Sequence, residues 1–117
     1  MVRTNIELLQ GSLDVIVLKT LSWQPMHGFG IARWIERVSE ARLRVEEGSL
    51  YPALYRMEIK GWVKADWRIT ENNRRAKYYR LTVAGRRKLA EATTTWETFA
   101  GVMAKIMYAT PAAAESA

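Results

Sequence analysis

The side chains best able to bind a ligand are basic, and most of them lie in one segment of this 117-residue chain. Residues 60–90 contain ten lysines and arginines against two acidic residues, a net charge of +8. The rest of the chain has eight basic and ten acidic residues, a net −2, so the whole carries +6. A concentrated basic segment attracts polyanions, most often nucleic acid. The alternative is a solvated basic face that only keeps the protein in solution.

Catalytic and metal-binding chemistry has little support in the same residues. The chain has no cysteine and one histidine, His27, so it has no thiol nucleophile and no thiolate for zinc, and a transition-metal cluster is not expected. No nucleophile elbow and no phosphate-cradling glycine loop occurs. The sequence therefore predicts a protein that is not an enzyme and needs no cofactor. His27, next to Gly28, is expected to serve as a helix cap or structural hydrogen-bonding residue.

Four helices are needed to position the basic segment, and apolar spacing predicts them. The first covers residues 5–22, preceded by a capping box of Thr4 and Glu7. A second follows the breaker residues 24–28 and has its apolar face between Ile31 and Val38. A third begins near residues 47–50 and ends at Gly61, and the last runs from 82 to 108, capped by Thr82. Between the second and third helices, residues 39–45 are irregular and hold at most a short strand.

The third helix contains a proline, Pro52, so the helix must start close enough before it for the proline to fall in the first turn. If Ser49 is the N-cap, Pro52 falls at the third helical position, where its missing N–H removes no internal hydrogen bond. After this helix, residues 62–68 and 77–81 alternate like strands, and the Asn72-Asn73 pair between them suits a tight turn. On the second strand, Tyr79 is expected in the core. The sequence thus predicts a β-hairpin with a charged tip.

This order of elements predicts a mainly α fold with a small β-hairpin, an α+β winged helix-turn-helix, followed by a long C-terminal dimerisation helix. We expect a DNA-binding domain at 1–81, the dimerisation helix at 82–109 and a disordered tail at 110–117. In a winged helix the third helix fits the DNA major groove, and the hairpin tip neutralises phosphates or enters the minor groove. A winged helix used only for protein or RNA contacts is the alternative.

Five stretches of the sequence resemble the PadR family of transcriptional regulators, in its short form with one C-terminal helix. They span about two-thirds of the chain, in the family's order and spacing. The departures are conservative: the family often has Thr, Leu and Glu where this chain has Ser49, Met57 and Ile59. The stretches that carry the resemblance are Leu9-Gln-Gly-Ser-Leu-Asp14, Met26-His-Gly-Phe-Gly-Ile31, Gly48-Ser-Leu-Tyr-Pro-Ala-Leu-Tyr-Arg-Met-Glu58, Lys60-Gly-Trp-Val63 and Lys77-Tyr-Tyr-Arg-Leu-Thr-Val-Ala-Gly85.

The resemblance implies a cytoplasmic, homodimeric regulator, usually a repressor, that binds a roughly palindromic site on double-stranded DNA and is released by a small molecule. Helical spacing independently places several polar residues of the third helix off its apolar face. Tyr51 and Tyr55 have an alternative, since their rings could pack on the first helix. The predicted DNA-binding residues are Ser49, Tyr51, Pro52, Tyr55, Arg56 and Lys60 on the third helix, and Arg74, Arg75 and Lys77 on the wing.

An apolar stripe on the last helix is longer than so small a domain can cover, which predicts that a second chain covers it. In the resemblance, Trp96 also stands where some members hold a flat aromatic effector at the dimer centre, with Phe99 and Met103 beside it. The alternative is that Trp96 is packed interface with no cavity. No apolar run is long enough for a membrane span, and no signal peptide is visible. The predicted dimer residues are Leu89, Ala92, Trp96, Phe99, Met103, Ile106 and Met107.

Overall fold

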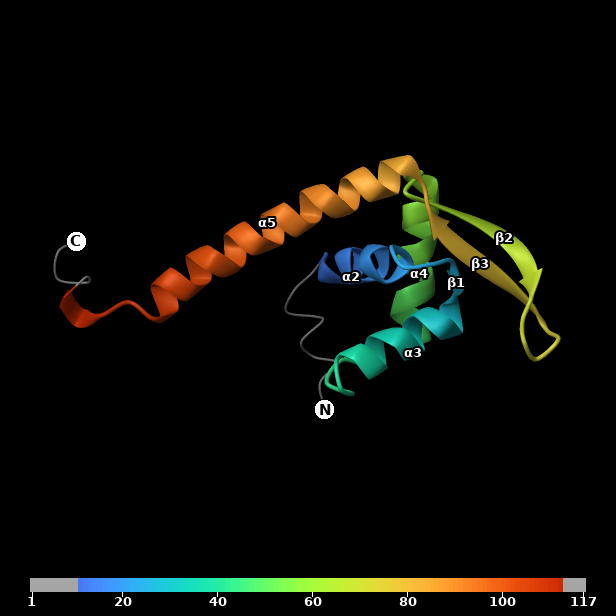
Figure 1. Ribbon diagram of the computed structural model, residues 1–117, viewed down its shortest axis with the longest axis horizontal. Coiled ribbons are helices and arrows are strands. Elements are labelled where there is room, and N and C mark those ends of the chain that lie inside the picture. Colours follow the sequence, from blue (N-terminus) through green and yellow to red (C-terminus); the bar gives the residue numbers. More distant parts are fainter. Residues whose placement is uncertain (1–10, 113–117) are drawn as a thin grey trace.

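The computed structural model describes residues 11–112 and shows four helices and three short strands in that range (Figure 1). The helices of the domain cross one another beside a small sheet, while the last helix extends away from them. Because of that helix the molecule measures 63 × 33 × 21 Å. The elements in chain order are α2 (Ser12–Leu21), β1 (Met26–His27), α3 (Gly28–Val38), α4 (Glu47–Ile59), β2 (Val63–Ile69), β3 (Arg75–Leu81) and α5 (Val83–Met107).

One apolar core joins α2, α3 and α4 to the base of the sheet. Leu18 of α2, Ile31 of α3 and Leu54 of α4 are at most 1 % exposed. Val63 and Leu81 close the core from the sheet, and Tyr79 is buried there, as the sequence predicted. Burial of such side chains is the main force that holds the three helices against the hairpin. The winged-helix α+β fold and the long last helix are therefore confirmed.

The sheet is antiparallel with strand order β1-β3-β2. Pairing of Val63 with Leu81 and of Ala65 with Tyr79 sets the register of the hairpin. Directly paired residues project from the same face, so the face that begins in the core continues outward through Trp67 and Lys77 and then Ile69 and Arg75. β2 and β3 form the wing, which extends beyond the helices (Figure 1).

Two predicted element boundaries are wrong near the N-terminal half. The first helix is not continuous over 5–22, because Gly11 has a φ of 92° and α2 begins after it; the Thr4–Glu7 capping box lies outside the described residues. The breaker residues contain a strand, Met26–His27, that pairs with β3. A two-residue strand has no periodicity to detect. Between α3 and α4 there is no strand, and Glu40 and Ala41 have left-handed backbone conformations.

α4 begins at Glu47, within the predicted range of residues 47–50, but its N-cap differs from the expected one. Its N-cap is Glu46, not Ser49, and the backbone N–H groups of Ser49 and Leu50 both donate to the Glu46 carbonyl. Pro52 is therefore inside the helix, where it cannot donate to the carbonyl of Gly48. Packing of Leu50, Ala53, Leu54 and Met57 on the core outweighs this loss.

Other local predictions are confirmed. His27 caps α3, its Nδ1 accepting from the N–H of Gly30 at 3.0 Å. Thr82 caps α5, its hydroxyl accepting from the N–H of Gly85 at 3.0 Å. Of the tail expected to be disordered, residues 111 and 112 are helical and residues 113–117 lie outside the described part. No helix in the described range is long and apolar enough to cross a membrane.

Candidate nucleic-acid interface

The exposed surface of α4 is divided into two sides by the elements beside it. On one side the carboxylate of Glu58 contacts Lys77 of the wing, at 3.3 Å between Nζ and Oε1. On the other side Arg56 contacts Asp14 of α2, at 3.0 Å. Helical spacing then places the remaining predicted residues: Tyr51 and Tyr55 lie on the side of the wing, and Ser49, Pro52 and Lys60 lie on the side of α2. All five of these residues are exposed.

Tyr51 is held by the first turn of α3, not by α2. A Cβ atom added to Gly28 would overlap the hydroxyl and ring carbons of Tyr51. Gly28 is buried beneath this ring, so only a glycine allows the approach. Tyr51 is still 44 % exposed, and Tyr55 is 66 % exposed. The contact therefore fixes the direction of Tyr51, and both tyrosine side chains remain partly exposed on the α4 surface.

The Arg56–Asp14 ion pair is a contact that the sequence did not suggest. Asp14 lies in the first turn of α2, where a carboxylate also complements the helix dipole. The Arg56 side chain is 52 % exposed and the Asp14 side chain 20 %. An exposed pair of this kind stabilises a fold by at most about 1 kcal/mol. Arg56 can thus exchange its carboxylate for a phosphate or a base edge at little cost.

The tip of the wing is a short hydrogen-bonded turn that presents two arginines. Asn73 has a φ of 61°, which confirms the turn expected from the Asn pair. The N–H of Thr70 donates to the carbonyl of Arg74 at 2.7 Å, and the N–H of Arg74 donates to the Thr70 hydroxyl at 3.2 Å. The Arg75 guanidinium lies 4.8 Å from the centroid of the Trp67 ring. Within residues 11–112, neither arginine has an ion pair.

Lys77 has a different environment from these two arginines. Its ammonium group pairs with Glu58 and its side chain is 37 % exposed. Next to it, burial raises the pKa of the Tyr79 phenol above its usual value of 10.0, while the charge of Lys77 opposes this rise. Lys77 therefore attaches the wing to α4, and its charge is already partly neutralised.

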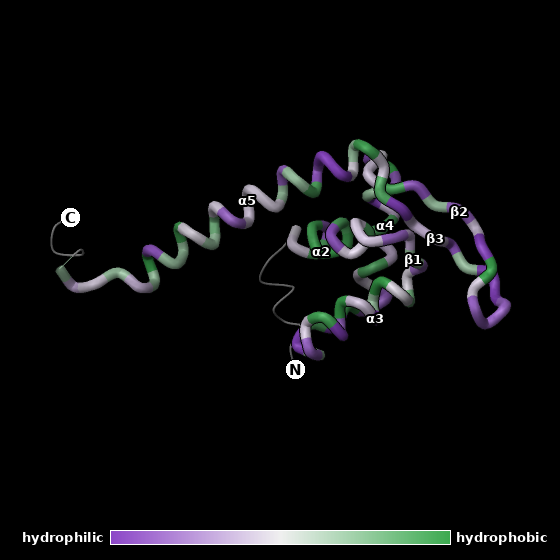
Figure 2. Tube along the Cα trace, viewed as in Figure 1, coloured by the Kyte–Doolittle hydropathy of each residue, from purple (hydrophilic) through white to green (hydrophobic). Residues whose placement is uncertain are grey.

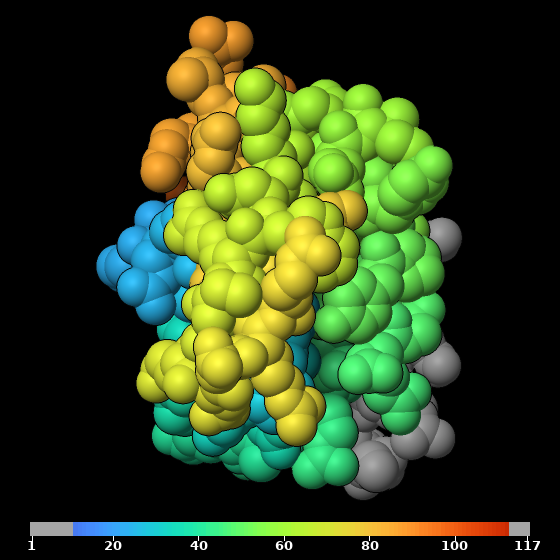
Figure 3. Space-filling model, turned by 90° about the vertical axis from the view of Figure 1, so that its right-hand side faces the viewer, coloured from blue at the N-terminus to red at the C-terminus, as the bar shows by residue number. Residues whose placement is uncertain are grey.

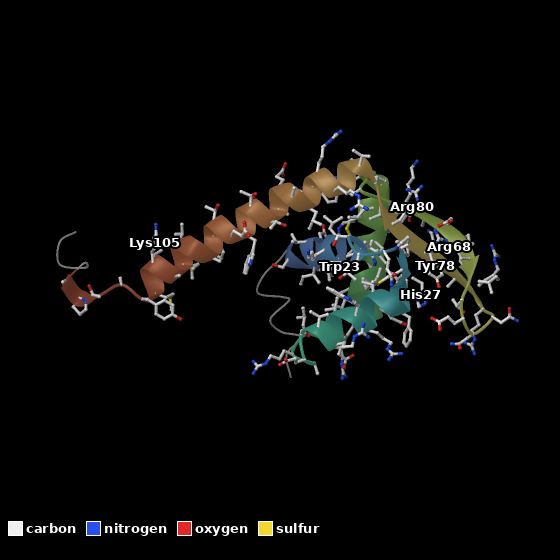
Figure 4. All side chains as sticks on the ribbon, viewed as in Figure 1. Trp23, His27, Arg68, Tyr78, Arg80 and Lys105 are labelled. Atoms are coloured by element: carbon white, nitrogen blue, oxygen red, sulfur yellow. The ribbon has the colours of Figure 1, made fainter. Side chains whose placement is uncertain are left out.

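The opposite face of the wing contacts His27, the last residue of β1 and the N-cap of α3. His27 packs edge-on against Tyr78 at 5.1 Å between ring centroids. The Arg68 guanidinium lies 5.3 Å from the centroid of the Tyr78 ring, and Figure 4 shows these three side chains together beside β1. The His27 ring also stacks with Phe29 of α3, at 6.3 Å between ring centroids. With Lys77 on one face and His27 on the other, the wing has a defined position beside α4.

One surface of the molecule therefore combines the wing with the outer side of α4. Figure 3 shows the wing, in yellow, in front and α4, in green, directly beside it. This surface has two projecting parts. One is α4, which presents basic and tyrosine side chains, and the other is the wing, which has cations at its tip. Such a pair of projections has the shape and charge needed for the adjacent grooves of a duplex.

The last helix carries a second accessible surface. Within α5 only Gly85 is buried, and Figure 2 shows apolar segments recurring along the helix. Trp96 and Phe99 are 50 % and 48 % exposed, with ring centroids 6.1 Å apart. They line a cavity of about 760 Å³ between α5 and α2, with Val15 and Leu18 on the α2 side. Met103, the third predicted effector residue, is not part of the lining and is 39 % exposed.

The comparisons with known proteins agree with this geometry. Residues 17–91 match the sequence profile described as "Transcriptional regulator PadR-like family". The chain belongs to the PadR-like family. The family resemblance found in the sequence is thereby confirmed, and with it a role in transcription regulation through DNA. The matched residues extend from α2 through the wing into the first part of α5.

Individual PadR-like and other regulators resemble the chain over most of its length. The transcriptional regulator Rv3488 of Mycobacterium tuberculosis is 35 % identical over 86 residues, which cover 73 % of this chain and 76 % of that protein. A transcriptional regulator from Clostridium thermocellum is 26 % identical, with a TM-score of 0.78 over 89 % of this chain and 96 % of that one. A PadR family regulator from Clostridium difficile is 29 % identical, with a TM-score of 0.72 over 83 % and 99 %.

Proposed function

We propose that this PadR-like protein is a cytoplasmic, homodimeric repressor that binds a roughly palindromic operator and is released from it by a small aromatic molecule. The observation that carries the proposal is the common surface of α4 and the wing: Tyr55 and Arg56 are exposed on α4, and the neighbouring wing has cations at its tip. Side chains of α4 would read base edges in the major groove, while Arg74 and Arg75 would bind phosphates.

Selection of bound fragments from genomic DNA tests this function directly. The purified protein is expected to enrich a small set of duplexes that share an inverted repeat, with half-sites about one helical turn apart because a twofold dimer presents two α4 helices. Competition with unlabelled RNA should not displace the duplex. Enrichment without any shared sequence, or displacement by RNA at equal concentration, would contradict operator recognition. Reporter transcription from an enriched fragment separates repression from activation.

Dimerisation is proposed through the apolar stripe of α5. In a single chain Phe99 of the stripe is 48 % exposed and Ile106 is 64 % exposed, and an apolar surface of this length needs a partner in water. Phe99→Asp would place a carboxylate in that interface, where it has no partner. We expect this variant to sediment as a monomer, or to aggregate, at a concentration where the wild type is a dimer.

Thr94 provides a control for this change. It is exposed and lies on the same helix, but five residues before Phe99 it projects about 140° away around the helix, on the face opposite the stripe. Thr94→Asp should therefore sediment like the wild type. A wild-type monomer at micromolar concentration in low salt would disprove the dimer, and equal loss of dimer in both variants would show that the stripe is not the interface.

In the proposed dimer, the cavity between α2 and α5 of one chain would lie next to the equivalent cavity of the other chain. The effector is proposed to bind at this junction. Trp96 and Phe99 offer apolar ring faces to a planar compound there. Met103, beyond the cavity, would contribute from the interface. Trp96→Leu should leave the dimer intact, because a large apolar side chain remains, but should weaken binding of a planar aromatic dye by at least about tenfold.

Dye fluorescence measures this without interference from the other tryptophans. Trp23→Leu is the control, because that indole is 64 % exposed and lies outside the cavity lining. If the wild type binds no planar dye, or if the Trp96→Leu variant binds it equally, Trp96 is packed interface and the effector proposal fails.

A further inference from the structure

Two large apolar side chains are exposed on the wing although they belong to the face that forms the core. Trp67 is 57 % exposed and Ile69 is 61 % exposed. The register places them in line with Val63 and Ala65, which pack on the core. Beyond Ala65 the hairpin extends past the helices, so no helix in the described part of the chain covers Trp67 and Ile69. Two large apolar side chains next to each other on an exposed face form a candidate contact surface for a partner.

The surroundings of this apolar pair are cationic. Trp67 is paired across the hairpin with Lys77, and Ile69 with Arg75. The Arg75 guanidinium lies 4.8 Å from the centroid of the Trp67 ring. Lys77 also contacts Glu58 of α4, which shows that this face of the wing is turned toward α4. We call this face, made of Trp67, Ile69, Arg75 and Lys77, the inner wing face.

We infer that the inner wing face packs against one sugar–phosphate strand of the duplex, at the place where that strand separates the major groove from the adjacent minor groove. This inference rests on the proposed DNA-binding function and deepens it. A strand that runs between α4 and the wing would pass along this face, since the two elements occupy neighbouring grooves. Trp67 and Ile69 would contact deoxyribose carbons, and Arg75, already placed beside the indole, would bind the flanking phosphate.

The chemistry of the face favours this partner over others. A nucleic acid strand presents anionic phosphates next to apolar sugar edges, and the inner wing face sets the two cations of β3 directly beside the two apolar side chains of β2. A second copy of the wing would bring like charges together, which opposes association. An apolar protein segment would bury the Arg75 guanidinium without a counter-charge, at a large desolvation cost.

Contacts with sugars and contacts with phosphates differ in their salt dependence, and this gives a sharp test. Trp67→Ala removes apolar contact but no cation, so the affinity for duplex should fall by about tenfold while the slope of log K against log salt stays unchanged. The loss should be similar for operator and non-specific duplex, because sugars carry no sequence information. Trp67→Phe keeps a ring and should recover most of the affinity.

Trp23 is a close control for Trp67. It is 64 % exposed and has a cation, the ammonium of Lys19, at 4.8 Å from its ring centroid, but it follows α2 and is not on the wing (Figure 4). Trp23→Ala should bind duplex as the wild type does. Thermal unfolding of both alanine variants checks that the fold is kept, which is expected because both indoles are largely exposed.

The results separate this inference from the proposed function. Duplex binding by Trp67→Ala equal to that of Trp23→Ala, or a lower salt slope in Trp67→Ala that marks the loss of the Arg75 contact alone, would overturn packing on the sugars and leave operator binding standing. A wild type that binds no duplex at all would overturn the proposed function, and the inner wing face as a strand contact with it.

Discussion

Replacing Arg74 and Arg75 together by alanine is expected to reduce the slope of log K against log salt by about 1.8, because each phosphate contact contributes about 0.9. At about 0.1 M salt this corresponds to roughly 60-fold weaker binding if the other contacts are unchanged. Neither arginine has an ion pair within the described residues, so neither change leaves a carboxylate unpaired in the free protein. Titrations of labelled duplex at several salt concentrations measure the slope.

Lys77 serves as the internal comparison for this double variant. Its ammonium group already pairs with Glu58, so Lys77→Ala should change the slope less than either arginine does. Operator and random duplex should weaken alike in the double variant, whereas Arg56→Ala on α4 should change the preference among operators. A double variant with the wild-type slope would show that the basic tip of the wing does not meet DNA.

The largest effect on stability is expected for Gly85→Ala, at the start of α5. Gly85 is buried, and a Cβ atom there would overlap the carbonyl oxygen of Trp62 and come within 3.2 Å of Leu81. That carbonyl accepts the N–H of Thr82 at 3.1 Å, so backbone rather than a flexible side chain must move. We expect the free energy of unfolding to fall by about 1–3 kcal/mol, the usual cost of overpacking.

The sign of this effect is what makes it diagnostic, because alanine normally stabilises a helix relative to glycine. Gly101 is also in α5 and has no atom within 4 Å of an added Cβ. Gly101→Ala should raise the free energy of unfolding by about 0.5–1 kcal/mol. Urea denaturation at one protein concentration compares both variants, since dimerisation makes stability depend on concentration. Equal or greater stability of Gly85→Ala would show that α5 does not start against Trp62 as described.

Contacts of this kind also explain how the exposed surface of α4 is held beside the wing. Tyr51 rests on the backbone of Gly28, Arg56 is held by Asp14, and Lys77 links the wing to α4. The three contacts come from three different elements and converge on one helix. α4 and the wing therefore already have a fixed relative position in the free protein. DNA binding would not have to supply the free energy of ordering them.

Features coded by neighbouring residues could be read from the sequence alone. The cap at Thr82 and the three- and four-residue spacing of Leu89 to Met107 predicted α5 almost to the residue. The alternation of side chains before and after Asn73 predicted the hairpin. The concentration of lysines and arginines in residues 60–90 predicted that the hairpin tip is basic. Each signal depends on residues within a few positions of one another, so it is present before the chain folds.

Tertiary structure alone decided the rest, because the partners are far apart in the chain. Asp14 and Arg56 are 42 residues apart, and Glu58 and Lys77 are 19 apart; no local pattern links them. The strand at Met26 exists only because β3 lies beside it. Helical spacing showed which residues of α4 avoid the core, but the packing of α2 and the wing against α4 determined which side each exposed residue faces. Contacts between residues far apart in the chain thus determined which side each exposed residue of α4 faces. Local periodicity determined where the helices and the hairpin form.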